Sequence, residues 1–310
     1  MTAFVDIVLP VFALLGIGYA AARLGYFDET ATRALSRFVF QFALPVMLFS
    51  SLAQQGRPAE FEVRYLLAYF IGVAVCAGTA ALLARSRGKT GARVAVVAGF
   101  SACYGNVVLL GIPLVLTALG EAATLPLFAL VSVHGPIMMT SVTILLERGR
   151  TDLPAGARLL ATIKGLFGNP ILIGLLLGIA VGASGFGLPS PVAASADLLG
   201  QAALPAALFA MGASLAGYRI RGALWLSLGL VGLKTVLQPL VVWLLVDYVF
   251  AIASPWSDTA ILLAAMPTGV NAYLFAVRYR TGEAESATAI LLSTAASLVT
   301  VSVILALRLG

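Results

Sequence analysis

Two apolar stretches of the sequence each place helix-breaking residues beside an uncharged amide. One covers residues 99–116 (GFSACYGNVVLLGIPLVL) and the other residues 266–279 (MPTGVNAYLFAVRY). Where a helix is interrupted inside a membrane, the new helix N-terminus directs the positive end of a backbone dipole at the break. Amide side chains add further donors and acceptors beside it. These residue types therefore favour the binding of a small anion.

Each stretch contains an asparagine that we expect to bind the ligand directly, Asn106 in the first and Asn271 in the second. A proline in a helix interior costs about 3 kcal/mol and removes a backbone donor, so Pro113 and Pro267 are predicted to mark the two breaks. One proline alone is commonly a kink, but paired interruptions in corresponding segments indicate a binding site. The further candidates for ligand contacts are Ser101, Tyr104, Gly105, Thr268 and Gly269.

Two ionisable residues stand in apolar segments outside the breaks. A cation such as Lys234 costs about 2.5–3.5 kcal/mol near the centre of a membrane helix, so it must face protein or water. It either neutralises a bound carboxylate or caps carbonyls freed by Pro239, and its candidate ion-pair partners are Asp197 and Asp247. His134, the single histidine, either takes part in proton coupling or makes a hydrogen bond within the helix packing.

The sequence contains no set of residues that indicates catalysis. With one histidine there is neither a metal-ligand cluster nor a Ser-His-Asp arrangement, so we expect no enzyme, no metal and no cofactor. Residues 99–116 and 266–279 include no carboxylate, so the acidic ligands common in sodium and proton antiporters are missing there. This leaves binding and transport as the function classes to weigh.

Composition identifies the solvent around these segments. Of the 310 residues, 61% are apolar and 10% are charged, and the mean hydropathy is +1.03. Soluble domains carry about 25% charged residues. A chain this apolar cannot bury all of its apolar surface in a soluble fold. Membrane helices need about 20 apolar residues each, and the sequence supplies many such runs. The sequence therefore predicts an all-α polytopic membrane protein whose main partner is the lipid bilayer.

Apolar runs between charged residues, glycines and prolines predict ten transmembrane helices. The expected ranges are 4–23, 34–54, 63–84, 93–119, 122–146, 165–184, 192–216, 222–247, 258–279 and 285–308. The division between the fourth and fifth helices rests on the short LGEAAT sequence at 119–124. The two stretches with paired breaks fall in the fourth and ninth helices.

The distribution of Lys and Arg predicts the orientation of the chain. Fifteen of the 19 cations fall in or beside the turns that follow odd-numbered helices. They are Arg23, Arg33, Arg37, Arg85, Arg87, Lys89, Arg93, Arg148, Arg150, Arg158, Lys164, Arg219, Arg221, Arg278 and Arg280. By the positive-inside rule this face is cytoplasmic. We therefore expect a multi-pass protein of the cell (inner) membrane with both termini outside. The net charge of +6 follows from this topology, so no nucleic-acid partner is expected.

An internal repeat divides the chain into two halves. QFALPVMLF at 41–49 matches QAALPAALF at 201–209 in six of nine positions, and the same offset of 160 pairs Gly18 with Gly178. We expect a first five-helix repeat at 1–147, a cytoplasmic connector at 148–164 and a second five-helix repeat at 165–310. Five is odd, so the second repeat enters the membrane inverted, which is the architecture of many secondary transporters.

Residues 9–53, the YGNVVLLGIPL sequence of the fourth helix and the MPTGVNAYLFAVRYR sequence of the ninth resemble the auxin efflux carrier family. The resemblance covers essentially the whole chain and is to the short-loop bacterial branch, which is associated with malonate-type carriers. It implies a five-plus-five inverted fold related to the bile acid/sodium symporters. It also implies that Asn106, Pro113, Pro267 and Asn271 lie at a crossover of helices 4 and 9 that holds the substrate.

In such a fold, helices 1, 2, 6 and 7 form a scaffold, commonly a homodimer, and helices 3–5 and 8–10 form a moving transport unit. We therefore expect a secondary active transporter that moves a small organic anion, a carboxylate or dicarboxylate, by elevator-type alternating access. The alternatives are a sodium-coupled organic-anion symporter of bile-acid type, a membrane sensor that binds its ligand without moving it, and an intramembrane enzyme.

Overall fold

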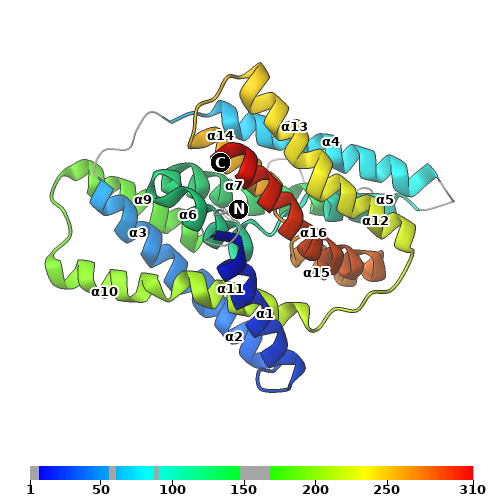
Figure 1. Cartoon of the computed structure of the whole chain (residues 1–310), viewed down its shortest axis with the longest axis horizontal. Coiled ribbons are helices and arrows are strands. Elements are labelled where there is room, and N and C mark those ends of the chain that lie inside the picture. The colour runs from blue at the N-terminus through cyan, green and yellow to red at the C-terminus, as the bar shows by residue number, and fades with distance from the viewer. Residues whose placement is uncertain (1–6, 56–60, 87–90, 147–167, 310) are drawn as a thin grey trace.

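The structure, a computed structural model, describes residues 7–55, 61–86, 91–146 and 168–309. The regular structure of these residues is helical, as predicted, and no strand occurs among them beyond one isolated bridge (Figure 1). The expected connector at 148–164 lies outside the described residues.

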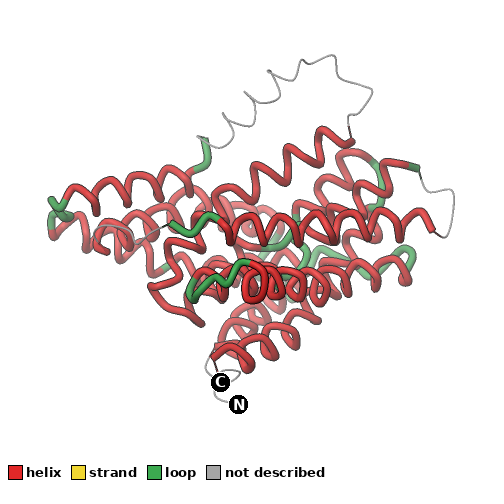
Figure 2. The backbone as a smooth tube through the Cα atoms, turned by 90° about the horizontal axis from the view of Figure 1, so that it is seen from above, coloured by secondary structure: helices red, strands yellow, loops and turns green. Residues whose placement is uncertain are grey.

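Helices make up most of the described backbone, with loops and turns between them (Figure 2). The helices of the N-terminal part are α1 Leu9–Arg23, α2 Glu29–Phe38, α3 Leu44–Gln55, α4 Arg64–Ser86, α5 Ala92–Cys103, α6 Ile112–Leu119 and α7 Thr124–Leu146. The helices of the C-terminal part are α9 Pro170–Ser184, α10 Ser190–Gln201, α11 Ala203–Leu215, α12 Leu224–Gly232, α13 Gln238–Leu244, α14 Trp256–Ala264, α15 Asn271–Tyr279 and α16 Glu283–Leu309.

Several of these helices join into longer rods through π-helical turns. Such turns occupy Val39–Ala43, Val107–Gly111 and Leu233–Leu237, and each is followed by an α-helix with proline at its second position. Proline cannot donate to the carbonyl four residues earlier and its ring crowds that carbonyl. A wider turn relieves the conflict, so the chain passes Pro45, Pro113 and Pro239 while remaining helical.

Six helical segments of the described chain are long and apolar enough to cross a membrane, judged by length and composition. They are Glu29–Gln54, Arg64–Ser86, Val107–Leu146, Ser190–Leu215, Leu224–Val249 and Glu283–Arg308, and three shorter apolar helices accompany them. The 40-residue segment contains both α6 and α7, separated by a 3-10 turn at Gly120–Ala123 where Gly120 has a φ of +67°. These findings establish a polytopic membrane protein.

One set of helices, α1, α2, α3, α9, α10 and α11, packs together and is called here the first helix group. Figure 1 shows α1, α2 and α11 in the lower part of the view and α3, α9 and α10 towards the left. Several contacts in this group are so close that only glycine fits. A Cβ added to Gly18 in α1 would lie 2.1 Å from the Phe209 carbonyl oxygen of α11, and one added to Gly178 in α9 would lie 2.9 Å from the Phe49 carbonyl oxygen of α3.

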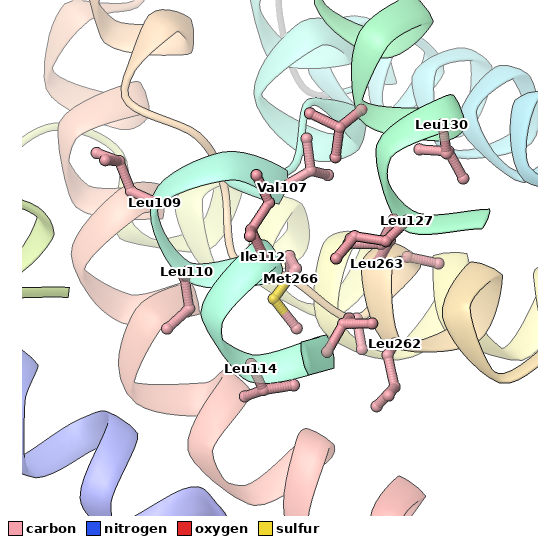
Figure 3. Close-up of a cluster of buried hydrophobic side chains, with 14 of the residues drawn as sticks. Val107, Leu109, Leu110, Ile112, Leu114, Leu127, Leu130, Leu262, Leu263 and Met266 are labelled. Atoms are coloured by element: carbon pink, nitrogen blue, oxygen red, sulfur yellow. The ribbon is translucent and has the colours of Figure 1, made fainter. Parts of the chain in front are cut away.

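The remaining helices, α4 to α7 and α12 to α16, are called the second helix group. Within it α4 packs on α5 and α13, α12 packs on α16, and α13 packs on α14. Apolar side chains from Val107–Leu119, α7 and the α14 segment meet in a buried cluster, which Figure 3 shows around Ile112, Leu127, Leu263 and Met266. This cluster packs behind the interrupted segments described next and holds them in place.

Candidate functional site

Two helices of the second group are interrupted. The first stops at Cys103, leaves Tyr104–Asn106 unwound and resumes as a π-turn at Val107. The second stops at Ala264 and resumes at Asn271 as α15. The first break thus lies at the predicted Gly105-Asn106 pair, whereas Pro113 stands seven residues later in the first turn of α6, where the preceding π-turn absorbs it. Pro267 lies inside the second break.

The two unwound segments bond to each other. Gly105 and Thr268 form an isolated antiparallel bridge. The backbone N–H of Asn106 donates to the Pro267 carbonyl at 2.7 Å, and the backbone N–H of Gly269 donates to the Tyr104 carbonyl at 2.8 Å. Backbone groups released by each break are therefore satisfied by the other break, which is what a low-dielectric interior requires of non-helical chain. We call this pair of segments, 104–106 and 265–270, the crossover.

The side chain of Asn106 secures the restart of its own helix. Its Oδ1 accepts a hydrogen bond from the Leu109 amide at 3.2 Å, as an N-cap does. Its Nδ2 lies 2.6 Å from the sulfur of Met211 in α11, so the same side chain also touches the first helix group. Sulfur is a weak acceptor. The Asn106 Nδ2 group can therefore exchange this contact for a hydrogen bond to a stronger acceptor, such as a carboxylate oxygen.

The second break is also bonded to two other helices. The Thr268 amide donates to the Ser293 hydroxyl of α16 at 2.9 Å, and the Thr268 hydroxyl donates to the Ser101 carbonyl of α5 at 2.9 Å. Asn271 donates through Nδ2 to the Tyr104 hydroxyl at 2.8 Å. Ser101 and Thr268 are fully buried, so they fasten the crossover and do not face its open side.

An aromatic stack continues from Tyr104 into the second helix group. Its ring lies between those of Phe100, 4.8 Å away between centroids, and His134 of α7, 4.9 Å away. His134 is fully buried, and its Nδ1 is 3.2 Å from the Tyr69 hydroxyl of α4. Of its two expected roles, this hydrogen bond within the helix packing is the one that the geometry displays.

Lys234 lies in the π-turn Leu233–Leu237 and is fully buried. Its ammonium donates to the carbonyl of Ala264, the last residue of α14, at 2.6 Å. Lys234 therefore caps a backbone carbonyl, which was one of its two expected roles. The carbonyl belongs to Ala264 at the second break, however, and is not one freed by Pro239. A Cβ added to Gly105 would lie 3.4 Å from Nζ, so the ammonium also borders the first break.

A cavity of about 860 Å³ opens from the crossover. The predicted site residues that line it are Tyr104, Gly105, Asn106, Gly269 and Asn271. Its other walls come from the Arg23–Phe40 region, the end of α11 and the start of α15. Asn106 and Asn271, distant in sequence, thus share one cavity wall, while Ser101, Thr268, Lys234 and His134 stand behind that wall.

The cavity has an aromatic and charged mouth that the sequence did not indicate. Tyr218 and Tyr273 meet edge to face with centroids 5.1 Å apart, and both line the cavity. Burial raises the pKa of Tyr218, with Tyr273 and Glu29 contributing, so its phenol remains a neutral donor. Arg33 pairs with Glu29 at 2.6 Å, while Arg23 donates to the Tyr19 hydroxyl at 3.1 Å.

A second cavity of about 710 Å³ lies near the opposite end of the 26-residue segment Glu29–Gln54, which is about 39 Å long at 1.5 Å per residue. Its walls include Gln54, Glu121, Asp197 and Gln201, and no crossover residue borders it. Asp197 accepts a hydrogen bond from the Ser50 hydroxyl at 2.7 Å. Asp197 is thus engaged at this second cavity and not with Lys234, as had been considered.

Comparison with known proteins identifies the family of the chain. A family model described as "Membrane transport protein" matches residues 3–305. The chain belongs to this family. It is the auxin efflux carrier family that the sequence motifs resemble, and membership identifies a membrane transporter and not an enzyme.

Relatives in this family cover the chain almost completely. A protein of Rhizobium meliloti (strain 1021) named "Putative malonate transporter" is 29% identical over 97% of this chain and 95% of its own length. The "Uncharacterized transporter YfdV" of Escherichia coli (strain K12) is 24% identical over 94% of both chains. The protein of the same name from Shigella flexneri matches to the same extent.

Proposed function

We propose that this chain is a secondary active transporter that moves a small organic anion, a mono- or dicarboxylate, by alternating access. The observation that carries the proposal is the crossover, where two interrupted helices place Asn106 and Asn271 in one wall of the same cavity. Restarting helices direct their N-termini at this wall, and backbone amides at such ends favour negative charge. The malonate named for the Rhizobium meliloti relative is a dicarboxylate of this class.

The two cavities support alternation between the faces of the membrane. The larger reaches the crossover from the Arg23 and Arg33 end, which the positive-inside rule makes cytoplasmic. The smaller approaches from the opposite end without reaching it. We infer that the structure is an inward-facing state with both termini outside.

The close glycine contacts support a ten-helix, five-plus-five inverted repeat. Gly18 packs on Phe209, and Gly178 packs on Phe49. Adding the repeat offset of 160 to Gly18 gives Gly178, and subtracting it from Phe209 gives Phe49. A contact between two halves recurs with its partners exchanged, as a two-fold relation between the halves demands.

The first helix group then supplies the scaffold, which corresponds to helices 1, 2, 6 and 7, and the second group supplies the mobile transport unit. Sliding of the second group against the first would carry the crossover from one cavity towards the other, which is elevator-type motion. The Asn106 contact with Met211 would break and re-form in each cycle because its partners belong to different groups. The homodimer implied by the resemblance would form through the first group.

The proposal is tested with purified protein in proteoliposomes. Malonate, longer dicarboxylates and monocarboxylates are compared first by the shift that each causes in thermal unfolding, and then by uptake and exchange of labelled substrate. We expect at least one carboxylate both to stabilise the protein and to exchange across the bilayer. Stabilisation without any flux would identify a ligand sensor, and no stabilisation by any carboxylate would refute the anion site.

A further inference from the structure

Two helices of the second group present their C-terminal ends to the crossover. α5 ends at Cys103 and α14 ends at Ala264. The carbonyls at a helix C-terminus carry the negative end of the dipole, and in transporters with interrupted helices such ends coordinate sodium ions or protons. The interior next to these ends therefore favours a positive charge.

Lys234 supplies that charge from within the chain. Its ammonium donates to the Ala264 carbonyl at 2.6 Å and borders Gly105, so it lies between the end of α14 and the first break. The side chain is fully buried. An ammonium has three donors and no acceptor, which suits a position beside a helix C-terminus, where carbonyls lack partners within the helix.

No described carboxylate neutralises this ammonium. Among the described Lys, Arg, Asp and Glu residues, Asp258 is the other buried member, and its Oδ1 accepts from Arg308 Nε at 2.6 Å. Asp247 is also bonded to Arg308, and Asp197 to Ser50. The crossover therefore carries an unbalanced positive charge that belongs to the second helix group.

We propose that Lys234 is a tethered counter-ion: its ammonium fills the place of a coupling cation and travels with the transport unit. The proposal rests on the elevator motion proposed above. Transport then needs no sodium at this position. A transport unit loaded with a monocarboxylate is neutral at the crossover, whereas the empty unit carries one positive charge.

This distribution of charge predicts which step of the cycle senses the membrane potential. Exchange of monocarboxylate for monocarboxylate uses the loaded unit in both directions, so its rate should be independent of potential. A unit loaded with a dicarboxylate carries one net negative charge at each crossing, so the rate of dicarboxylate exchange should depend on the potential. Net uptake always includes the return of the empty, positively charged unit and should depend on it as well.

The wild-type protein provides the first test. Proteoliposomes are given a potassium gradient and valinomycin to set the potential, with sodium replaced by choline. We expect the rate of monocarboxylate exchange to change by less than about twofold with potential, and net uptake of the same anion to change by about fivefold or more, as expected when a charge crosses the field. Exchange as sensitive to potential as net uptake, or a requirement for sodium, would overturn the proposal.

Variants then assign the charge to its residue. Lys234→Met should make monocarboxylate exchange dependent on potential, and Lys234→Arg should retain the wild-type independence. Gln238→Leu is the matched control, since Gln238 is also fully buried one turn further along the same helical rod and carries no charge. Exchange that stays independent of potential in Lys234→Met would refute the assignment, and should that variant fail to fold, the wild-type comparison decides alone. Absence of flux for every carboxylate in the wild type would instead refute the proposed function.

Discussion

The two breaks at the crossover differ in how they are held. The first is three residues long, and Asn106 caps the restart of its own helix. The second is six residues long, Val270 provides no side-chain cap, and besides its bonds to the first break it bonds to Ser293 and Ser101 on other helices. The first break is a local structure, whereas the second depends on its surroundings. A change in the neighbouring helices will therefore move the second break more readily than the first.

The largest effect that would expose this difference comes from adding one methyl group to each break. In Gly269→Ala the new Cβ would lie 2.6 Å from the Tyr104 ring and 3.1 Å from the Gly105 carbonyl oxygen. Such overpacking costs about 1–3 kcal/mol, and 1.4 kcal/mol corresponds to a tenfold change in rate. We expect substrate exchange to fall by about tenfold or more, measured in proteoliposomes.

Gly105→Ala is the matched control for that substitution. Its Cβ would lie 3.4 Å from the flexible end of Lys234, an ordinary van der Waals contact. Exchange should remain within about twofold of wild type. Equal losses in the two variants would show that the breaks are held in the same way.

The two asparagines should separate stability from transport. Asn106→Ala removes an N-cap and should lower the free energy of unfolding by about 1 kcal/mol. Asn271→Ala removes one bond on a half-buried, cavity-facing side chain, and water can replace it, so the loss should be below about 0.5 kcal/mol. Both should reduce exchange by about tenfold. Thermal unfolding in detergent measures the first difference, and an Asn271→Ala protein as unstable as Asn106→Ala would contradict it.

The smallest effect concerns the hydrogen bond from the Asn271 side chain to the Tyr104 hydroxyl, which lies in the cavity wall. Tyr104→Phe keeps the ring between Phe100 and His134 but removes the hydroxyl that Asn271 bonds. A neutral hydrogen bond contributes about 1 kcal/mol, so substrate affinity should fall by about fivefold. The concentration of substrate giving half-maximal exchange measures this change. An unchanged value would mean that Asn271 is positioned without Tyr104.

The sequence predicted the interrupted helices from local chemistry. Gly, Asn and Pro are all poor helix formers, and their combination at Gly105-Asn106 and around Pro267 indicates the breaks. Pro113 misleads for a physical reason, since a π-turn allows the chain to remain helical around a proline. A pattern of residue types does not show whether a wider turn or an unwound segment resolves the conflict.

The partners of the crossover were beyond reach of the sequence because they come from distant helices. Met211, Ser293 and Tyr69 stand in unremarkable apolar segments, and packing alone brings them to Asn106, Thr268 and His134. Lys234 was recognised as costly, yet its contact with Ala264 depends on where α14 ends in space. The positions of the breaks were predictable from residue types, and their three-dimensional connections were not.

The exchanged contacts of Gly18 with Phe209 and of Gly178 with Phe49 bear on how the protein is made. α1 packs on α11 and α3 packs on α9, and the ribosome delivers α9 and α11 only from residue 170 onward. Until then the surfaces of α1 and α3 that pack on α11 and α9 contact lipid instead. A chain truncated after α7 should therefore insert but fail to assemble, and the two halves should mature as one cooperative unit.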